Sequence, residues 1–259
     1  MSVSQIELSL TPALFEWRTL TQGHTTVAVD VLRATTAICA AFQAGAECIV
    51  PLDSLEALEP YRAQGYLRAA ERGGRKIGDA EYGNSPTEYM STDLHGKRIA
   101  YSTTNGTVSI LRGGDADRTL VGCFANIDAL SERLLAQPQD LVILCSGWKN
   151  DFSIEDTLFA GALCRRLLDS GLYTSRHDAV AMSVALWDAC QGDPYTYSLR
   201  HASHVQRLIG FGAEADILFA FECNTCPVVP QLNNGVSSSM TSVANSCLSS
   251  CSWRKLTPR

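Results

Sequence analysis

Short apolar runs alternate along the chain with longer segments in which apolar residues recur every three or four positions. Runs of four to eight apolar residues are typical of buried strands, and the longer periodicity is typical of helices packed on one side. The apolar runs predict strands at 24–30, 46–52, 66–72, 97–104, 118–124, 140–146 and 226–230. The periodic segments predict helices at 33–45, 54–64, 126–137, 154–168, 178–192 and 197–212.

Alternating strands and helices are characteristic of α/β proteins in which helices cover both faces of the sheet. We therefore predict a three-layer α/β/α fold with a mainly parallel or mixed sheet. Residues 1–236 are expected to form this domain, which could be divided into two subdomains. From Ser237 onward the chain holds eight serines and no periodicity. We expect residues 237–259 to form a flexible Ser/Cys-rich tail.

Composition places the chain among ordinary globular proteins, with 46% hydrophobic and 19% charged residues. The formal net charge of −6 argues against nucleic acid and anionic membranes as partners. No apolar run approaches the roughly 18–20 residues of a membrane span. The first ten residues, MSVSQIELSL, lack the basic and apolar regions of a signal peptide. We therefore expect a cytoplasmic protein; whether it forms a homo-oligomer is left open.

Ten cysteines are many for a cytoplasmic chain. Six lie in apolar segments, where a thiol behaves as a small hydrophobic group. The other four form C-x2-C and C-x3-C pairs near the end: Cys223, Cys226, Cys247 and Cys251. This spacing is a weak indication of zinc, because no histidine or acidic partner accompanies it. Disulfides are not expected in a reducing compartment.

Polar residues collect just after several predicted strands, where open α/β sheets bind their ligands. They occur in the stretches DVLRATT (30–36), AERGG (70–74), STTNGT (102–107) and SGWKND (146–151). Taken singly, each has a structural explanation. Asp30 could pair with Arg33, Glu71 and Arg72 could be a solvated pair, and an Asn-Gly step is a common turn. Their shared position at the strand ends is what favours a site.

Familiar catalytic motifs are missing. The sequence contains no P-loop, no GxGxxG after a strand, no GxSxG elbow and no HxxxH pair. Asp30 is followed two positions later by Leu32, so the DxDxT signature of haloacid-dehalogenase-type phosphatases also fails.

Three acids crowd the start of the helix predicted at 154–168, next to Lys149. Ser153 and Asp156 have the spacing of a capping box, in which each side chain binds the other's backbone N–H. That leaves Asp151 and Glu155 unexplained by capping. Oxygen ligands of this kind favour a hard cation such as Mg2+.

Five stretches, in this order, resemble the signature segments of the 2-phosphosulfolactate phosphatase family: DVLRATT, the ER of residues 71–72 with its following glycines, GNSP (83–86), TTNGT and GWKNDFSIEDTLFAG (147–161). The resemblance covers about residues 1–236 and ends with VVPQLNNGV (228–236). The Ser-rich tail and ECNTC (222–226) depart from the family pattern.

The resemblance implies a three-layer α/β/α fold and Mg2+-dependent hydrolysis of 2-phospho-3-sulfolactate to 3-sulfolactate and phosphate. It also implies a place on a route to coenzyme M or to sulfolactate. Two other functions stay open: a phosphatase of another 2-hydroxy-acid phosphate, and a non-catalytic anion-binding protein.

The expected partner is a small anionic phosphoester, so binding requires a local cationic pocket in a net-negative chain. We expect Asp30 and Lys149 to be catalytic, with Asp30 as nucleophile, general base or metal ligand. The expected substrate-binding residues are Arg33, Arg72, Asn84, Thr104, Asn105 and Gly106. The expected Mg2+ ligands, direct or through water, are Asp30, Glu71, Asp151 and Glu155.

Overall fold

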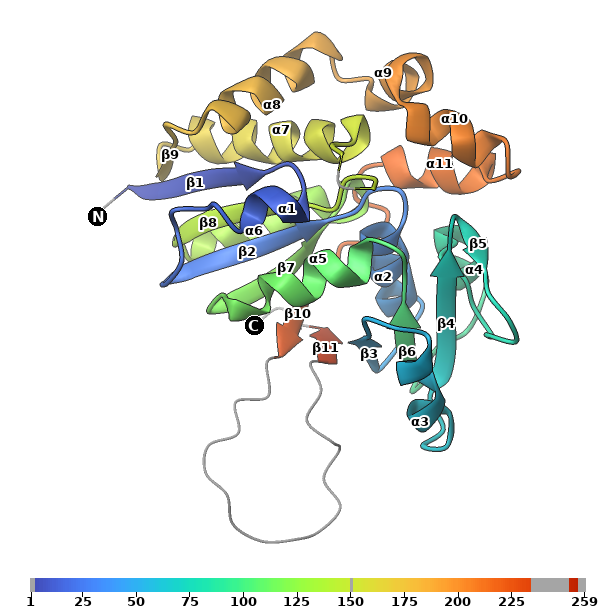
Figure 1. The fold of residues 1–259 in the computed structure, drawn as a ribbon. Coiled ribbons are helices and arrows are strands. Elements are labelled where there is room, and N and C mark those ends of the chain that lie inside the picture. The colour runs from blue at the N-terminus through green and yellow to red at the C-terminus, as the bar shows by residue number, and fades with distance from the viewer. Residues whose placement is uncertain (1–2, 150, 234–251, 256–259) are drawn as a thin grey trace, which may run out of the picture.

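The computed structural model describes residues 3–149, 151–233 and 252–255. Over these residues the chain forms one eleven-stranded sheet with helices on both faces (Figure 1). The strands are β1 (Ser4–Ser9), β2 (His24–Val29), β3 (Cys48–Pro51), β4 (Leu67–Arg72), β5 (Arg75–Lys76), β6 (Arg98–Ser102), β7 (Arg118–Gly122), β8 (Asp140–Cys145), β9 (Tyr173–Thr174), β10 (Pro230–Asn233) and β11 (Ser252–Lys255).

Helices connect most of these strands. The α-helices are α1 (Pro12–Phe15), α2 (Ala34–Gln43), α3 (Glu59–Arg62), α4 (Pro86–Met90), α5 (Gly106–Arg112), α6 (Ile127–Ala136), α7 (Ile154–Asp169), α8 (Asp178–Ala189), α9 (Pro194–His201), α10 (Ser203–Ile209) and α11 (Glu214–Phe221). Short 3-10 turns are η1 (Glu56–Leu58), η2 (Gly113–Asp115) and η3 (Phe124–Asn126). Among the helices of the described residues, none is long and apolar enough to cross a membrane.

The sheet is mixed, with the strand order β5-β4-β6-β3-β11-β10-β7-β2-β8-β1-β9. Its larger part, from β7 to β9, is parallel, as is the group of β3, β6 and β4. The antiparallel strands β10 and β11 lie between these two groups (Figure 1). β2 and β8 are parallel neighbours, so the loops that follow them lie at one edge of the sheet. The loops after β4 and β6 lie together at the carboxyl ends of the other parallel group, which the antiparallel pairings β7–β10, β10–β11 and β11–β3 set in the opposite direction along the sheet.

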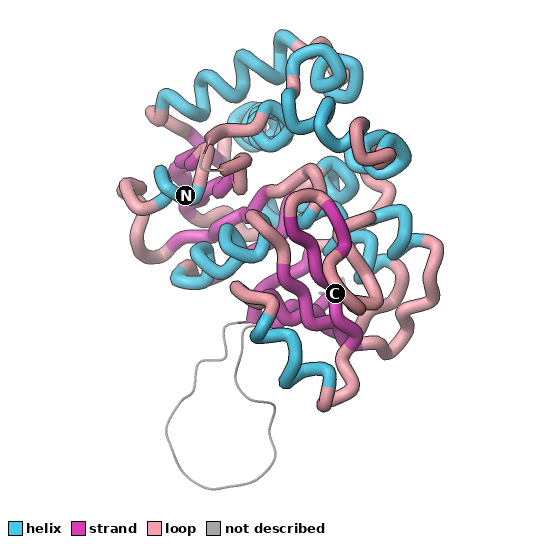
Figure 2. Tube along the Cα trace, turned by 45° about the vertical axis from the view of Figure 1, so that its right-hand side comes forward, coloured by secondary structure: helices cyan, strands magenta, loops and turns pink. Residues whose placement is uncertain are grey.

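The alternation of side chains along the strands builds two cores. On β2, Val27 and Val29 face a core shared with α6, α7 and α8, whereas Ala28 faces the core that contains α2 and Ile110 of α5. Figure 2 shows the helices lying on either side of the strands. The predicted three-layer α/β/α fold is therefore confirmed, and the sheet is of the mixed kind.

Three predicted elements differ from the structure. The helix expected at 54–64 is reduced to η1 and α3, with Pro60 at the start of α3. The helix expected at 197–212 is divided at Ala202, whose backbone is extended, into α9 and α10. In place of the strand expected at 226–230, β10 begins at Pro230. The strand β1, which the prediction missed, alternates polar residues with buried Ile6 and Leu8.

Part of the expected C-terminal tail lies in the sheet. Ser252–Lys255 forms β11, which pairs with β10 on one side and β3 on the other. The other residues of 237–259 lie outside the described part of the chain. The boundary between the domain and the tail stays a prediction.

Candidate active site

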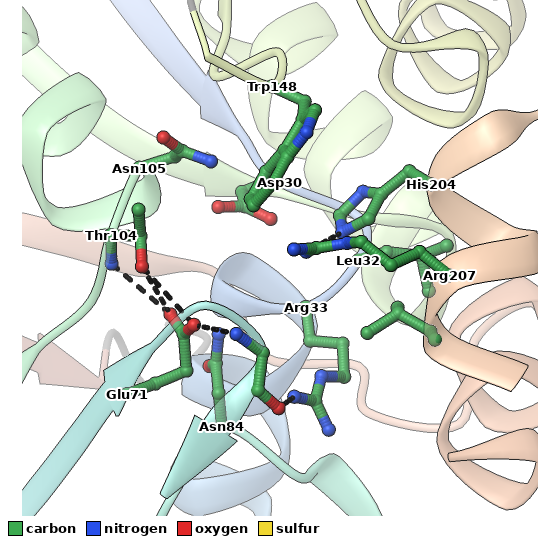
Figure 3. Close-up of a pocket in the computed structure, with 12 residues that line it drawn as sticks. Asp30, Leu32, Arg33, Glu71, Asn84, Thr104, Asn105, Trp148, His204 and Arg207 are labelled. Atoms are coloured by element: carbon green, nitrogen blue, oxygen red, sulfur yellow. Dashed lines mark hydrogen bonds between the residues drawn. The ribbon is translucent and has the colours of Figure 1, made fainter. Parts of the chain in front are cut away.

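A cavity lies at the carboxyl ends of β2, β4 and β6, beside the loop after β8 (Figure 3). Six of the residues expected to form the site line it: Asp30, Arg33, Glu71, Asn84, Thr104 and Asn105. Six further residues, none of them among the expected site residues, complete the lining: Leu32, Gly74, Trp148, His204, Arg207 and Leu208. The cavity measures about 20 Å³, which is room for about one water molecule.

Asp30 directly follows β2 and is held at the start of α2. Its Oδ1 accepts a hydrogen bond from the backbone N–H of Ala34 at 3.3 Å, and its own N–H donates to Thr35 Oγ1 at 3.0 Å. The Thr35 hydroxyl donates back to the Asp30 carbonyl at 2.8 Å. These bonds explain the spacing of DVLRATT: the acid ends the strand and the threonine locks the turn into the helix. The carboxylate is only 8% exposed.

Glu71 is the second-last residue of β4, and its side chain binds the loop after β6. Its carboxylate accepts hydrogen bonds from the N–H of Gly74 and from the N–H and hydroxyl of Thr104, the last two at 3.2 Å. Asn84 is fixed in a similar way, because the Tyr101 hydroxyl donates to its Oδ1. The oxygen-rich side of the cavity is therefore rigidly built.

Arg33 is braced by Asp216, a residue of α11 that the sequence analysis missed. The Arg33 Nη1 to Asp216 Oδ2 distance is 2.7 Å, and Nη2 donates to the Gly74 carbonyl at 2.7 Å. The second oxygen of Asp216 accepts bonds from the hydroxyls of Ser85 and Thr87, both at 2.6 Å. Asp216 thus fastens three segments around the cavity through one buried carboxylate.

Asp156 ties together the loops that follow β2 and β8. One carboxylate oxygen accepts from the N–H of Val31 at 2.8 Å and the other from the N–H of Gly147 at 3.1 Å. The predicted capping box is therefore wrong: Ser153 makes no side-chain capping bond, and Asp156 binds neighbouring loops instead. Two backbone donors on the adjacent strand ends compete successfully for the carboxylate.

Burial and mutual repulsion raise the pKa values of the acids here. The pKa of Asp30 lies well above its usual range, first because of desolvation and then because of nearby Asp156. Desolvation and the charge of Glu155 raise the pKa of Asp156 to about 7. Within the described residues, Asp30, Glu71 and Asp156 form no ion pair with a basic side chain. The cluster therefore needs protons or a cation to balance its charge.

A second cavity of about 240 Å³ lies next to the first, and Trp148 and His204 line both. Asp151 and Glu155, two of the expected metal ligands, line the second cavity. Glu155 Oε1 lies 2.7 Å from His204 Nδ1, while Asp151 is exposed and accepts the N–H of Phe152. The structure therefore brings Asp30 and Glu71 to one cavity and places the other two acids across the Trp148–His204 wall.

Lys149 is exposed beside Trp148, with its Nζ 5.5 Å from the indole centroid, and does not line the first cavity. The cation that does reach the cavity beside Trp148 is Arg207. Its guanidinium carbon lies 3.5 Å from the indole centroid. His204 and Arg207 are three residues apart on α10, a spacing that places both on one face of the helix. That spacing is the signal the sequence offered.

Two further residues expected to bind substrate are placed otherwise. Arg72 donates to its neighbour's carbonyl and to Ser102 Oγ at 2.9 Å, and does not line the cavity. Gly106 begins α5 where a Cβ would lie 2.2 Å from that of Ala34 and 2.7 Å from Asp30 Oδ2. The absence of a side chain at Gly106 lets α5 approach Asp30 and α2, so its role in the structure is close packing.

The donor chemistry suits a hard divalent cation, although the four expected ligands do not surround one point. In the described residues, no three His, Cys, Asp or Glu side chains are grouped as a metal site. Oxygen donors dominate the first cavity, and Glu155 Oε2 is buried without a hydrogen-bond partner among the described residues. A buried acid cluster of this composition fits Mg2+. Binding of Mg2+ stays a prediction, and of the four expected ligands Asp30 and Glu71 are the two that line this cavity.

The expected zinc cysteines are only partly described. Cys223 is exposed and Cys226 is buried, with its Sγ 4.0 Å from Met90 Sδ. Cys247 and Cys251 lie outside the described residues, so the zinc hypothesis stays a prediction.

The fold and cavity define an α/β protein with a site lined by acids and arginines at the carboxyl ends of its strands. Comparison with known proteins gives the family. The model of the family described as 2-phosphosulpholactate phosphatase matches residues 10–235. The chain belongs to this family, whose members are phosphoric monoester hydrolases, and the resemblance in the sequence is confirmed.

Individual relatives agree. A probable 2-phosphosulfolactate phosphatase of Prochlorococcus marinus (strain MIT 9313) is 39% identical over 219 residues, which cover 81% of this chain and 90% of the relative. One from Thermosynechococcus vestitus is 37% identical, covering 81% and 89%. One from Caldanaerobacter subterraneus subsp. tengcongensis is 31% identical, covering 81% and 88%.

The raised pKa of Asp156 predicts a pH-dependent stability. The unfolded chain loses this proton near pH 4, whereas the folded protein keeps it to about pH 7. The contribution of Asp156 to stability is therefore fully present below about pH 4 and is lost as the pH rises to about 7. In EDTA, Asp156→Asn should flatten the fall of Tm over this window, and the exposed control Asp169→Asn should not. Equal slopes for Asp156→Asn and the parent would contradict the assignment.

Loss of the Asp216 carboxylate should destabilise the fold. Asp216→Ala leaves Arg33 buried without its counter-charge, and breaking such a pair costs about 3–5 kcal/mol. Urea unfolding should show this loss, while Glu214→Ala on the exposed side of α11 should change stability by less than about 1 kcal/mol. If Asp216→Ala lowers the free energy of unfolding no more than Glu214→Ala does, the Arg33–Asp216 ion pair contributes little to stability.

Proposed function

We propose that the chain is a Mg2+-dependent phosphatase that converts 2-phospho-3-sulfolactate to 3-sulfolactate and phosphate. The observation that carries the proposal is the meeting of buried, unpaired acids with arginines in one cavity at the strand ends. The names of the relatives support the substrate. Release of 3-sulfolactate would serve a route to coenzyme M or to sulfolactate itself.

Hydrolysis of a phosphate monoester depends mainly on alignment of the reacting groups and on neutralising charge. Asp30 and Glu71 would hold the metal ion, which when bound supplies positive charge to the phosphoryl oxygens. Asp30 is anchored by Ala34 and Thr35, so its carboxylate is aimed before the substrate arrives. The side-chain amide of Asn105 lines the cavity and can donate to a phosphoryl oxygen.

The cationic half of the site offsets the net charge of −6. Arg33 and Arg207 line the cavity, and arginine binds oxyanions through paired N–H donors. A substrate with phosphate, sulfonate and carboxylate groups needs more than one such partner. The catalytic role of Lys149 remains a prediction, since this side chain lies outside the cavity wall.

Phosphate release from 2-phospho-3-sulfolactate by the purified protein tests the proposal. We expect release with Mg2+, its loss in EDTA, and a fall of at least about 100-fold in kcat/KM for Asp30→Asn, since electrostatic groups at a reacting centre contribute about this much. Asp169→Asn, an exposed acid at the end of α7, is the matched control and should retain activity.

The outcomes separate the alternatives. Release from other 2-hydroxy-acid phosphates but not from the sulfonate would assign the site to a different substrate. No release from any of these esters by folded, Mg2+-supplied protein would overturn the phosphatase proposal. Full activity of Asp30→Asn would leave the reaction but move its centre away from Asp30.

A further inference from the structure

The two arginines of the cavity differ in whether the guanidinium already has a carboxylate partner. Both Nη atoms of Arg33 are committed, one to Asp216 and one to the Gly74 carbonyl, each at 2.7 Å. Arg207 forms no ion pair with a carboxylate among the described residues. Its contacts are with an indole, a phenyl ring and an imidazole, which leave the guanidinium's charge without a fixed anion. Arg207 is therefore the cation available to a ligand.

The neighbours of Arg207 hold it in a defined position. Its guanidinium lies on the face of Trp148, with 3.5 Å between the guanidinium carbon and the ring centroid. Its Nη2 lies 3.2 Å from His204 Nε2. Because a guanidinium can only donate, Nε2 accepts this bond and the ring proton resides on Nδ1, which donates to Glu155 Oε1 at 2.7 Å. Buried Glu155 thus orients the imidazole, and the imidazole orients Arg207.

The position of Arg207 points to a specific part of the substrate. Glu71, Thr104 and Asn105 lie on one side of Asp30, and His204 and Arg207 come from α10 on the other side (Figure 3). Trp148 and His204 line the cavity at Asp30 and also the neighbouring, larger cavity of about 240 Å³. A substrate whose phosphoryl group lies at Asp30 therefore extends its other groups toward this wall, where Arg207 lies.

We propose that Arg207 binds the sulfonate of the substrate, and that Trp148, His204 and Glu155 are positioning residues for it. This inference rests on the proposed function, with the phosphoryl group at Asp30. A sulfonate offers several oxygens to the edge of the guanidinium, and its constant negative charge matches a cation that has no carboxylate partner here. Arg207 would then select sulfonated substrates over those with a plain methyl group at the same carbon.

The test compares 2-phospho-3-sulfolactate with 2-phospholactate, which lacks only the sulfonate. A hydrogen bond to a charged group contributes about 1.5–3 kcal/mol, so Arg207→Met should lower kcat/KM for the sulfonated ester by about 10–100-fold. For phospholactate the change should stay within about threefold. Arg207→Lys should recover part of the loss. Arg200→Met, an exposed arginine of α9, is the control and should affect neither ester.

The positioning role of Glu155 predicts a kinetic effect that differs from that of Arg207→Met. Glu155→Gln should weaken the preference for the sulfonated ester mainly through KM. The substitution loosens the positions of His204 and Arg207, while the positive charge of Arg207 stays. An equal loss for both esters in Arg207→Met would show that Arg207 acts on the shared phosphate or carboxylate, and would overturn the inference while the proposed function stands.

Calorimetric binding of 3-sulfolactate and lactate makes the inference testable even if no phosphate is released. The parent should bind 3-sulfolactate more tightly than lactate, and Arg207→Met should remove this difference. If the parent hydrolyses neither ester, the proposed function fails, and this titration decides the inference alone. Equal binding of both ligands by the parent, or a preference unchanged in Arg207→Met, would contradict a sulfonate site at Arg207.

Discussion

The site depends on the carboxylate of Asp156, which accepts backbone N–H bonds from the loops after β2 and β8. These two strands are neighbours in the sheet, and their loops carry Asp30 and Trp148. One carboxylate at the start of α7 therefore joins the acid side of the cavity to its aromatic wall. The cost is a buried charge, seen in the raised pKa of Asp156.

Apart from the Arg33–Asp216 pair, the charged groups of the cavity are held by separate partners rather than paired with one another. Asp216 holds Arg33, Thr104 holds Glu71, and Glu155 holds His204. Acids and arginines thus face the same cavity without neutralising each other within it. A cation can then meet the acids while an anion meets the arginines, which is the arrangement that a metal-assisted reaction on a phosphoester requires.

The strand ends were predictable because apolar runs and the polar residues after them are local patterns. Glu71 and Thr104 meet as expected, since β4 and β6 are parallel neighbours whose carboxyl ends lie together. Asp30 joins them in the cavity although β2 belongs to the other parallel group, an arrangement that no local pattern shows. Asp216, His204 and Arg207 were missed because they lie on helices far along the chain, and nothing local shows which cavity a helix faces. The capping box failed for the same reason: Asp156 has the right spacing, but tertiary contacts supply better donors. Gly106 needed its neighbour Ala34 in view before its packing role could be seen.

The central claim is that the buried acids form a cation site organised around Asp30. Isothermal titration of Mg2+ into the protein, without substrate, tests it most directly. The account predicts saturable binding by the parent, a Tm that rises with Mg2+ concentration, and at least about tenfold weaker binding by Asp30→Asn, since removal of one anionic ligand costs roughly 1.4 kcal/mol or more. Binding by Asp30→Asn as tight as that of the parent, or no saturable binding by the parent, would contradict the claim.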